Sequence, residues 1–425
     1  MRIAVVGSGI SGLSASYLLA PHAEVTLFES AAELGGHTHT EDVTLGGKPF
    51  AVDTGFMVYN PRRYPYLIAL LKELGVESTD TVMSFSVSVP GEVEYSSSYA
   101  GLFGNTKQLM RPAFWRLLYD ILRFNRLAKR FLDETAPGDA TLLRDFVTRY
   151  GFSRQLVEWY RFPMLGSIWS AASGDIDAYP ARETFRFLDN HLLLNVFNKP
   201  TWRTVRGGSR EYVRALERVF AQEGVAVRTA SPVTTIRRTE RGVEITTASG
   251  TEPFDHVVVA THADTALSLL EDASADERDI LSAFAYADNE VVLHSDTSLM
   301  PQSKKAWAAW NFLGGPHSGK TISLTYSMNM LQHVPEEHPI FVTLNPRTPV
   351  DETLVHRRYT YSHPMFNMNA QRAQERMPGI QGQRNTSFAG AHLGFGFHED
   401  GIQSAVRVVE KLGFPIRLTP EYPAP

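Results

Sequence analysis

The chain opens with Met1-Arg-Ile-Ala-Val-Val-Gly7-Ser-Gly9-Ile-Ser-Gly12, a short apolar strand that runs directly into the pattern Gly-x-Gly-x-x-Gly. The first glycine permits a tight turn, the second lets the backbone approach a pyrophosphate, and the third allows a helix to pack closely on the strand. We expect that helix over residues 13–19 and a second strand over 24–28. Glu29 follows about 20 residues after the first glycine, where a carboxylate can accept the hydroxyls of a ribose. The opening therefore predicts a dinucleotide-binding unit with phosphate at a helix N-terminus.

Length and composition exclude several classes of protein. A chain of 425 residues is too long for one compact core, and a net charge of −5 argues against a general nucleic-acid binder. The absence of cysteine excludes disulfides, thiolate zinc sites, iron–sulfur clusters and a cysteinyl-linked flavin. No apolar run reaches the roughly 18 residues of a membrane-spanning helix. A strand beginning at Arg2 leaves no room for a signal peptide, so a cytoplasmic protein is expected.

The patterning splits the nucleotide-binding parts into three pieces, with a second lobe inserted twice between them. We expect an α/β fold in which a Rossmann-like FAD-binding lobe is formed by residues 1–60, 205–270 and 380–415. The substrate lobe, formed by residues 61–204 and 271–379, should combine helices with an antiparallel sheet.

The expected elements follow from local periodicity. Residues 61–200 are helical in pattern, and residues 280–365 alternate apolar and polar side chains as antiparallel strands do. A helix is expected over Arg210–Glu223, and another is expected to begin near Gly401. Strands are expected over residues 225–228, 233–238, 243–247 and 255–260. The last of these is rich in β-branched residues, which is typical of a buried parallel strand.

Several motifs resemble the superfamily of flavin-containing amine oxidases, phytoene desaturases and protoporphyrinogen oxidases. They are Val6-Gly-Ser-Gly-Ile-Ser-Gly12, Glu29, Leu34-Gly-Gly36, Asp53-x-Gly55, Gly207-Gly208, Val257-Val-Val-Ala-Thr261 and Phe388-Ala-Gly390. Three further stretches resemble bacterial FAD-binding proteins that are often encoded beside cyclopropane-fatty-acid synthase genes. They are Ala306-Trp-Ala-Ala-Trp-Asn311, Thr343-Leu-Asn-Pro346 and Gly396-Phe-His-Glu-Asp-Gly401. The resemblance implies FAD as the cofactor and a lipid context.

The resemblance also implies which residues hold FAD. They are Gly7, Ser8, Gly9, Ser11 and Gly12 at the pyrophosphate, Glu29 at the ribose, Gly35, Gly36 and His37 in the loop that passes the cofactor, Val233 at the adenine, and Gly390, Asp400, Gly401 and Ile402 at the flavin end. Two positions depart from the family pattern. His37 stands where relatives often carry a basic residue, and Ala391 stands where they carry an acid. The ribityl contact must then come from elsewhere, and His392 and Asp400 are the candidates.

The segment before Gly401 offers candidates for catalysis. A helix N-terminus there would favour negative charge on a flavin, and His398, Glu399 and Asp400 would lie beside the ring. His398 and Glu399 are therefore candidate catalytic residues for proton transfer. The alternative is that the acids only cap the helix, as acids at that end commonly do.

Two motifs match patterns for nucleotide binding or metal binding, and we reject both interpretations. Residues 314–321 match the P-loop pattern, but residues 321–328 alternate like a strand where a P-loop requires a helix. A hairpin turn fits residues 314–319 better. His37-Thr-His39 offers two ligands for a metal, but no third ligand has a recognisable spacing, so we expect no metal site.

Residues 107–131 combine seven basic residues and one acid with Leu, Phe, Trp and Tyr. A basic amphipathic helix of this composition can lie on the inner membrane surface as a peripheral contact, or it can be a structural helix whose arginines coat a solvated face. Several other residues are candidates for the lining of an apolar substrate tunnel. They are residues 192–197, Trp307, Trp310, Tyr326, Tyr361 and Phe366. The alternative for each of these is a place in the core.

The expected function is that of an FAD-dependent oxidoreductase that desaturates a long-chain lipid or fatty acyl substrate, with hydride transfer to the flavin. Three alternatives stay open: a flavin amine oxidase, a redox-neutral isomerase of unsaturated acyl chains, and a lipid escort protein without catalysis. The sequence leaves the oligomeric state and the electron acceptor open.

Overall fold

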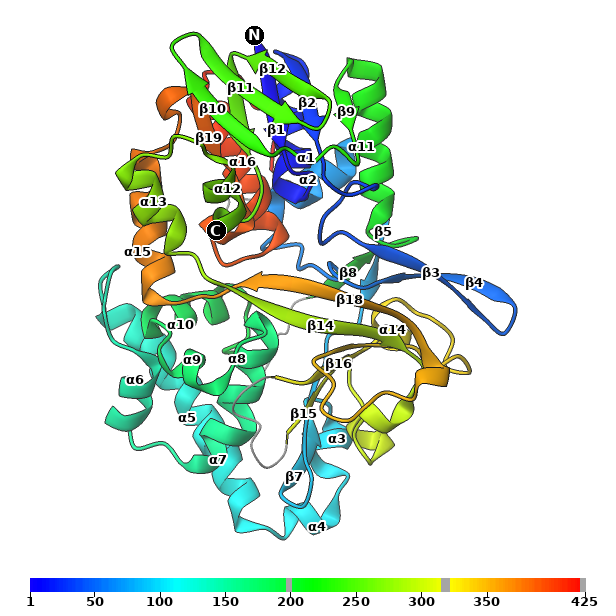
Figure 1. Ribbon diagram of the computed structural model, residues 1–425. Coiled ribbons are helices and arrows are strands. Elements are labelled where there is room, and N and C mark those ends of the chain that lie inside the picture. Colours follow the sequence, from blue (N-terminus) through cyan, green and yellow to red (C-terminus); the bar gives the residue numbers. More distant parts are fainter. Residues whose placement is uncertain (196–200, 315–321, 421–425) are drawn as a thin grey trace.

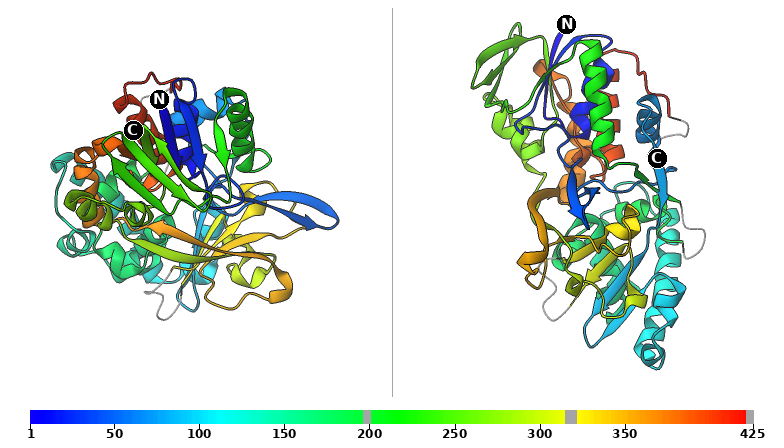
Figure 2. Two further views of the ribbon diagram at one scale, coloured as in Figure 1. Left: turned by 45° about the horizontal axis from the view of Figure 1, so that its top comes forward. Right: turned by 90° about the vertical axis from the view of Figure 1, so that its right-hand side faces the viewer.

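The computed structural model describes residues 1–195, 201–314 and 322–420, which form two lobes, one above the other in the orientation of Figure 1. The upper lobe contains a parallel sheet, and the lower lobe contains an antiparallel sheet flanked by helices. The side view in Figure 2 shows the same division along the long axis of the molecule.

The upper sheet has five parallel strands in the order β19-β13-β1-β2-β9. They are β1 (Arg2–Val6), β2 (Glu24–Phe28), β9 (Ala226–Arg228), β13 (His256–Val259) and β19 (Thr386–Phe388). The strands come from three distant stretches of the sequence. Strands β1, β13 and β19 are buried on both faces, as a parallel sheet covered on each side requires, whereas the edge strand β9 is exposed.

The two faces of this sheet belong to separate cores. On β1, Ile3 and Val5 pack with helices α1 (Ile10–Leu19), α11 (Arg210–Glu223) and α16 (His398–Lys411). Ala4 and Val6 face the other way, in the core that also holds side chains of β10 and β11. That second layer is the antiparallel sheet β10 (Thr235–Thr239), β11 (Gly242–Thr247) and β12 (Gly250–Phe254), with α12 (Ala263–Leu269), α13 (Ala275–Ser282) and α15 (Met368–Arg376).

The lower lobe contains a seven-stranded sheet in the order β18-β14-β17-β16-β15-β6-β7. Its strands are β6 (Phe85–Val89), β7 (Val93–Ser96), β14 (Tyr286–His294), β15 (Trp310–Leu313), β16 (Leu324–Ser327), β17 (Phe341–Leu344) and β18 (Val355–Pro364). All neighbouring pairs are antiparallel except β6 and β15, which are parallel. The antiparallel sheet expected in residues 280–365 is present.

The helices of the lower lobe lie beside this sheet in Figure 1, with α14 in the same lobe. They are α3 (Tyr99–Phe103), α4 (Thr106–Leu109), α5 (Pro112–Glu134), α6 (Leu143–Arg149), α7 (Arg154–Leu156), α8 (Phe162–Trp169), α9 (Ser173–Asp177), α10 (Ala181–Asn190) and α14 (Met328–Leu331), with a π-helical turn at Val157–Arg161. Helix α2 (Pro65–Glu73) and two small sheets complete the fold. The small sheets pair β3 (Thr40–Leu45) with β4 (Lys48–Asp53), and β5 (Ser78–Thr81) with β8 (Trp202–Val205).

Two sequence expectations about elements need correction. The stretch 61–200 is not helical throughout, because β5, β6 and β7 lie within it. Strand β6 alternates serine with phenylalanine and valine, and β7 alternates Val93 and Tyr95 with polar residues, a period of two that the surrounding leucine-rich helices mask. Strand β10 begins at Thr235, two residues later than expected. The hairpin turn expected at 314–319 lies outside the described residues beyond Gly314, and β16 begins at Leu324.

Helices α1 and α16 meet at a glycine. A Cβ atom on Gly401 would lie 2.6 Å from Ile10 Cγ2 and 2.8 Å from Ser11 Oγ, both in the first turn of α1. The two helix N-termini can therefore lie side by side only because residue 401 has no side chain.

We expect Gly401→Ala to destabilise the protein by about 1–3 kcal/mol, because the added methyl overpacks the α1–α16 contact. Gly379→Ala is the matched control, since a Cβ there meets no atom within 4 Å. The measurement is urea unfolding followed by circular dichroism. Equal stability of the two variants would contradict this account of the helix contact.

Candidate functional site

The turn between β1 and α1 is tightly packed at Gly7 and Gly12 and leaves open space at Gly9, so that it forms a cradle. Gly7 has φ +99°, and a Cβ on Gly12 would lie 1.8 Å from the Gly7 carbonyl oxygen. A Cβ on Gly9 would meet nothing within 4 Å. Helix α1 has no side-chain cap and no acid in its first turn, so its N-terminal N–H groups and positive dipole end are available to an anion.

Glu29 lies beside this cradle. Its Oε2 accepts hydrogen bonds from Ser8 N (2.9 Å) and Ser8 Oγ (2.6 Å), and its Oε1 accepts one from Ala31 N (2.8 Å). Burial alone would raise the pKa of Glu29, but the hydrogen bonds from Ala31 and Ser8 hold it below its usual value. Glu29 is therefore an ionised acceptor next to the phosphate cradle, as binding of a ribose requires.

Two other segments that the sequence analysis predicts to contact FAD also lie close to this cradle. A Cβ on Gly36 would lie 3.1 Å from Gly9 Cα, and Gly35 N donates to the Ser8 carbonyl oxygen (3.1 Å). Ser231 N, two residues before Val233, donates to the Glu29 carbonyl oxygen (2.8 Å). The glycine-rich loop and the segment just before Val233 thus lie beside the cradle, while their contacts with FAD stay predictions.

The start of α16 differs from the sequence expectation. The helix begins at His398 rather than near Gly401, because Asp400 Oδ2 accepts the Phe397 N–H (2.9 Å) and closes the first turn there. His398 and Glu399 are therefore inside the first turn and do not precede the helix. Burial raises the pKa of Asp400 to about 6. Ile402 is fully buried in the core that α1 shares, so its side chain serves packing.

The imidazole of His398 is fixed by its neighbours. Its Nε2 lies 3.1 Å from Thr38 Oγ1 and 3.0 Å from Tyr212 OH, and the ring stacks on Phe56 at 3.7 Å. Burial lowers the pKa of His398 to about 3, with repulsion from His37 adding to the effect. The ring is neutral near pH 7.

Glu399 caps a neighbouring helix. Its two carboxylate oxygens accept the N–H groups of Tyr66 and Leu67, each at 3.1 Å, at the start of α2. The side chain is buried, and burial raises the pKa to about 7 despite these hydrogen bonds. The structure thus gives Glu399 a structural partner, while catalytic roles for His398 and Glu399 stay predictions.

The sequence analysis did not anticipate a cluster of three histidines between the lobes. His37 lies in the glycine-rich loop, His262 follows β13, and His363 is on β18. The ring centroid of His37 is 6.0 Å from that of His262 and 5.6 Å from that of His363. The only sequence signal was the pair His37-Thr-His39, which packs on one face of β18 against Tyr361 and Tyr359. Within the described residues, no group of three or more His, Asp or Glu side chains is arranged to hold a metal ion.

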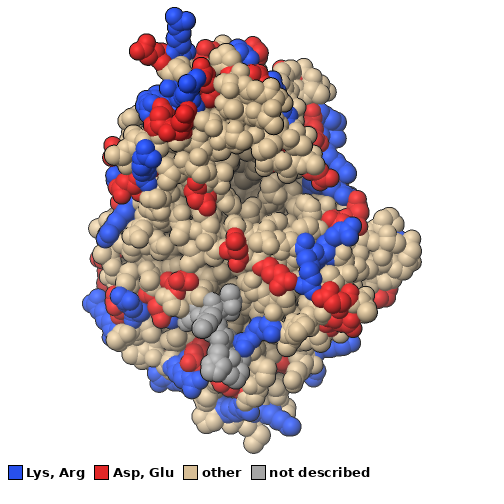
Figure 3. Space-filling view, in the orientation of Figure 1, with Lys and Arg blue, Asp and Glu red and all other residues tan. Residues whose placement is uncertain are grey.

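The surface above β14 and β18 is hollowed below the upper lobe (Figure 3). The residues present fit FAD on three observations: an open glycine cradle at an uncapped helix N-terminus, an ionised carboxylate beside it, and a second helix N-terminus packed against the first. Glu29 and the Gly7–Gly12 turn would hold the adenosine diphosphate part. The N-terminus of α16 would favour negative charge on the flavin.

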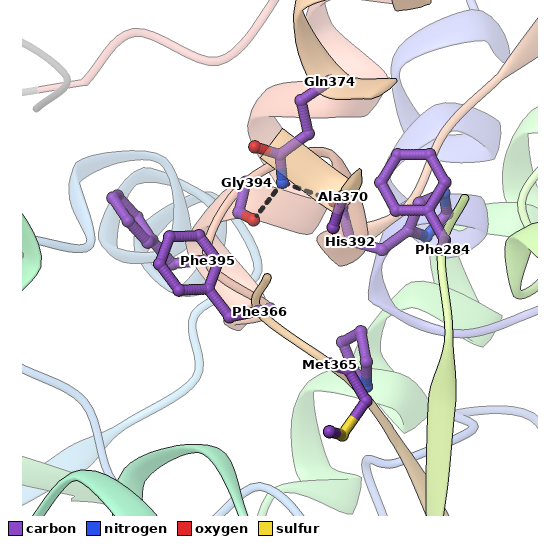
Figure 4. Close-up of a pocket in the computed structure, with 10 residues that line it drawn as sticks. Phe284, Met365, Phe366, Ala370, Gln374, His392, Gly394 and Phe395 are labelled. Atoms are coloured by element: carbon purple, nitrogen blue, oxygen red, sulfur yellow. Dashed lines mark hydrogen bonds between the residues drawn. The ribbon is translucent and has the colours of Figure 1, made fainter. Parts of the chain in front are cut away.

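A separate small cavity lies where β18 ends, as Figure 4 shows. It has a volume of about 10 Å³, which is room for about one water molecule. Gln374 Nε2 closes one side by donating to the carbonyl oxygens of His392 (2.8 Å) and Gly394 (2.7 Å). This cavity is too small for a substrate.

The expected tunnel residues fall into separate groups. Phe366 stacks on Trp169 in the core of the helices, Trp310 packs on Tyr326 inside the sheet, and Trp307 packs on Phe341. Tyr361 packs on His37. Residues 196 and 197 of the expected lining lie outside the described part of the chain.

Glu399→Gln should remove part of the pH dependence of stability. The carboxyl titrates near 4.5 in the unfolded chain and near 7 in the folded protein, so wild-type stability falls as pH rises between these values, by at most about 3 kcal/mol. Glutamine does not titrate. Urea unfolding of both proteins at pH 5 and pH 8 measures the difference, in which the other titrating groups cancel. Parallel pH dependences would show that Glu399 is not the group responsible.

The chain matches the family model of flavin containing amine oxidoreductases over residues 10–309. Comparison with curated proteins finds no match. Solved structures of similar fold include a CLA-producing fatty acid isomerase from P. acnes, with TM-score 0.68, 16% identity and coverage of 96% of this chain and 98% of that chain. A putative protoporphyrinogen oxidase from Exiguobacterium sp. 255-15 has TM-score 0.67 and 17% identity, covering 97% and 98%. Cyclohexylamine oxidase from Brevibacterium oxydans IH-35A has TM-score 0.68 and 15% identity, covering 97% and 99%.

The family model spans well over half of the chain, and the cradle, the carboxylate and the paired helix N-termini supply what a flavin dinucleotide needs. The protein therefore belongs to the flavin containing amine oxidoreductases and is an FAD-dependent oxidoreductase.

Proposed function

We propose that this enzyme acts on a long-chain lipid or fatty acyl substrate and removes hydrogen from the chain to form a double bond. The observation that carries the proposal is an aromatic core that runs from the helical lobe to the start of α16. Phe187 stacks on Phe397 at 5.1 Å and packs on Phe395 at 5.3 Å, and Phe395 packs on Phe366 at 5.4 Å. An apolar surface of this kind can pack against an alkyl chain.

The chain's own residues would supply position and a dry environment for this reaction. Bound FAD supplies the acceptor for hydride. The glycine cradle and Glu29 would hold the cofactor, and the N-terminus of α16 would favour negative charge beside it. Phe395 and Phe397 directly precede that helix, so an acyl chain packed on them would lie at the same helix end.

The similar fold of the fatty acid isomerase is consistent with an acyl substrate, while the oxidases among the solved structures keep amines as the second candidate. At 13–17% identity these likenesses show the fold alone.

Anaerobic bleaching of the flavin absorbance near 450 nm tests the proposal. We expect the purified yellow protein to bleach with oleate or a phospholipid extract and to stay yellow with putrescine or cyclohexylamine. Bleaching by amines alone would overturn the lipid proposal. A double-bond shift without bleaching would indicate the isomerase, and a colourless protein would indicate an escort.

We further propose that α3 to α5 contact an anionic membrane surface from which the lipid is taken. Five large apolar side chains in this part are exposed: Tyr99, Met110, Trp115, Tyr119 and Leu122. Arg116, between Trp115 and Tyr119, and Arg126, one turn after Leu122, are also exposed on α5. Exposed aromatic residues among arginines match the headgroup region of an anionic bilayer. No helix among the described residues is long and apolar enough to cross a membrane.

Sedimentation with vesicles tests this surface. The wild type should pellet with phosphatidylglycerol vesicles at low salt, where the attraction between the arginines and the anionic lipid is weakly screened. It should pellet much less with phosphatidylcholine vesicles, which carry no net charge to attract the arginines. Tyr119→Ser combined with Leu122→Ser should reduce pelleting severalfold. Val227→Ser combined with Leu354→Ser, at exposed apolar residues elsewhere, is the matched control. Equal pelleting of both double variants would assign α5 a purely structural role.

A further inference from the structure

A groove opens beside the C-terminal half of α5. Its volume is about 580 Å³, which falls in the range of roughly 300–1,000 Å³ that small-molecule sites occupy. Most of its lining side chains come from α5, and Leu194 and Asn195 of the segment after α10 form the opposite wall. Helix α5 belongs to the lower lobe, whereas the glycine cradle belongs to the upper lobe (Figure 1). The groove is therefore separate from the site for FAD.

One face of α5 leads into this groove as a stripe of solvent-exposed side chains. Its first half is apolar and consists of Trp115, Tyr119 and Leu122. Its second half is charged and contains Arg126 and Asp133, which are also exposed. Trp115 and Asp133 are about five full turns apart, and the steps of three or four residues between them keep the side chains on one side of the helix. Leu122 marks the change from apolar to charged and lines the groove.

Two basic side chains in the middle of the groove are able to bind an anion. Arg126 is exposed and makes no ion pair or hydrogen bond within the described part of the chain. Lys129 Nζ donates to Asn195 Oδ1 (2.5 Å) and lies 3.9 Å from Asp189 Oδ1. Because an ammonium group has three hydrogens to donate, Lys129 keeps donors for a ligand. The anion would thus be held by one free cation and one anchored cation.

The far end of the groove is acidic. Asp133 is exposed and, among the residues that the structure describes, has no ion-pair partner. The neighbouring Glu134 is occupied, because its Oε1 accepts from Arg130 Nε at 2.6 Å. Asp133 follows Lys129 by one helical turn, which is about 6 Å along the axis. A ligand whose anionic group lies at Lys129 therefore meets a carboxylate one turn further on, where a cationic group is favoured.

We propose that this groove binds the headgroup of a phospholipid in which a primary amine follows the phosphate, as in phosphatidylethanolamine. The acyl end lies toward Leu122, the phosphate lies at Arg126 and Lys129, and the ammonium group lies at Asp133. A guanidinium group suits phosphate because it donates two parallel hydrogen bonds. An ammonium group donates to a carboxylate, which the trimethylated amine of choline cannot do. The inference rests on the proposed function, which brings the protein to a lipid surface.

Isothermal titration calorimetry of the FAD-loaded full chain tests the groove without a membrane and without turnover. The ligands are the dihexanoyl forms of phosphatidylethanolamine, phosphatidylcholine and phosphatidylglycerol, each below its critical micelle concentration, and inorganic phosphate. We expect the ethanolamine lipid to bind about two- to fivefold more tightly than the other two lipids, which is the contribution of one exposed ion pair. Inorganic phosphate, which lacks the acyl and amine contacts, should bind most weakly.

Two variants separate the phosphate contact from the amine contact. Arg126→Gln should weaken the binding of all three lipids by about two- to fivefold, because each of them carries a phosphate. Asp133→Asn should abolish the preference for the ethanolamine lipid and leave the affinity for the choline lipid unchanged. Arg218→Gln, at an exposed arginine of α11 in the upper lobe, is the matched control and should bind as the wild type does. Circular dichroism checks that the variants are folded.

Equal affinity of the wild type for the three lipids would overturn the proposal, as would an Asp133→Asn variant that still prefers the ethanolamine lipid. Inorganic phosphate that binds as tightly as the ethanolamine lipid would identify a free-phosphate site instead. Failure of the proposed function is distinguishable. A chain that prefers the ethanolamine lipid but whose flavin is not bleached by lipid keeps the groove and loses the lipid oxidation. A chain that is bleached by lipid and binds the three lipids equally loses only the groove.

Discussion

The rest of the structure depends on the close approach of two helix N-termini. Helix α1 starts at the glycine turn after β1, and α16 starts almost 400 residues later. They touch because residue 401 has no side chain against Ile10 and Ser11. Each N-terminus has unpaired N–H groups and the positive end of a helix dipole. Side by side, they create one region that favours negative charge, and the site for FAD follows from that region.

A buried carboxylate then ties the two lobes to this region. Asp53 Oδ1 accepts hydrogen bonds from Thr40 Oγ1 (2.5 Å) and from Ser209 N and Oγ (both 2.8 Å), and Oδ2 accepts one from Gln332 Nε2 (2.7 Å). These partners come from the β3 hairpin, the start of α11 and the end of α14. Burial removes water from the Asp53 carboxyl group and raises its pKa to about 6. The four hydrogen-bond donors offset part of the cost of that lost hydration. Through Gln332, the carboxylate links the lower lobe to the upper lobe.

The sequence was informative where the structural cause is local. The fingerprint, the strand over 24–28 and the helix Arg210–Glu223 follow from glycine positions and periodicity within a few residues, and the structure contains all three. It was uninformative where the partner is distant. Glu399 caps α2, which lies more than 300 residues earlier in the chain, and no spacing rule connects the two. The histidine cluster joins a loop, a strand end and a β18 residue that only the folded topology brings together.

The pKa shifts of the buried acids and histidines at the junction of the lobes have a common cause. Burial raises the pKa of Asp53, Glu399 and Asp400 and lowers the pKa of His37 and His363. Each shift favours the neutral form, because a low-dielectric interior penalises charge of either sign. The exception is Glu29, whose hydrogen bonds keep it ionised at the edge of the cradle. The interior is thus neutral at the junction of the lobes, and it holds hydrogen-bond donors and helix dipole ends at the site for FAD, which brings negative charge.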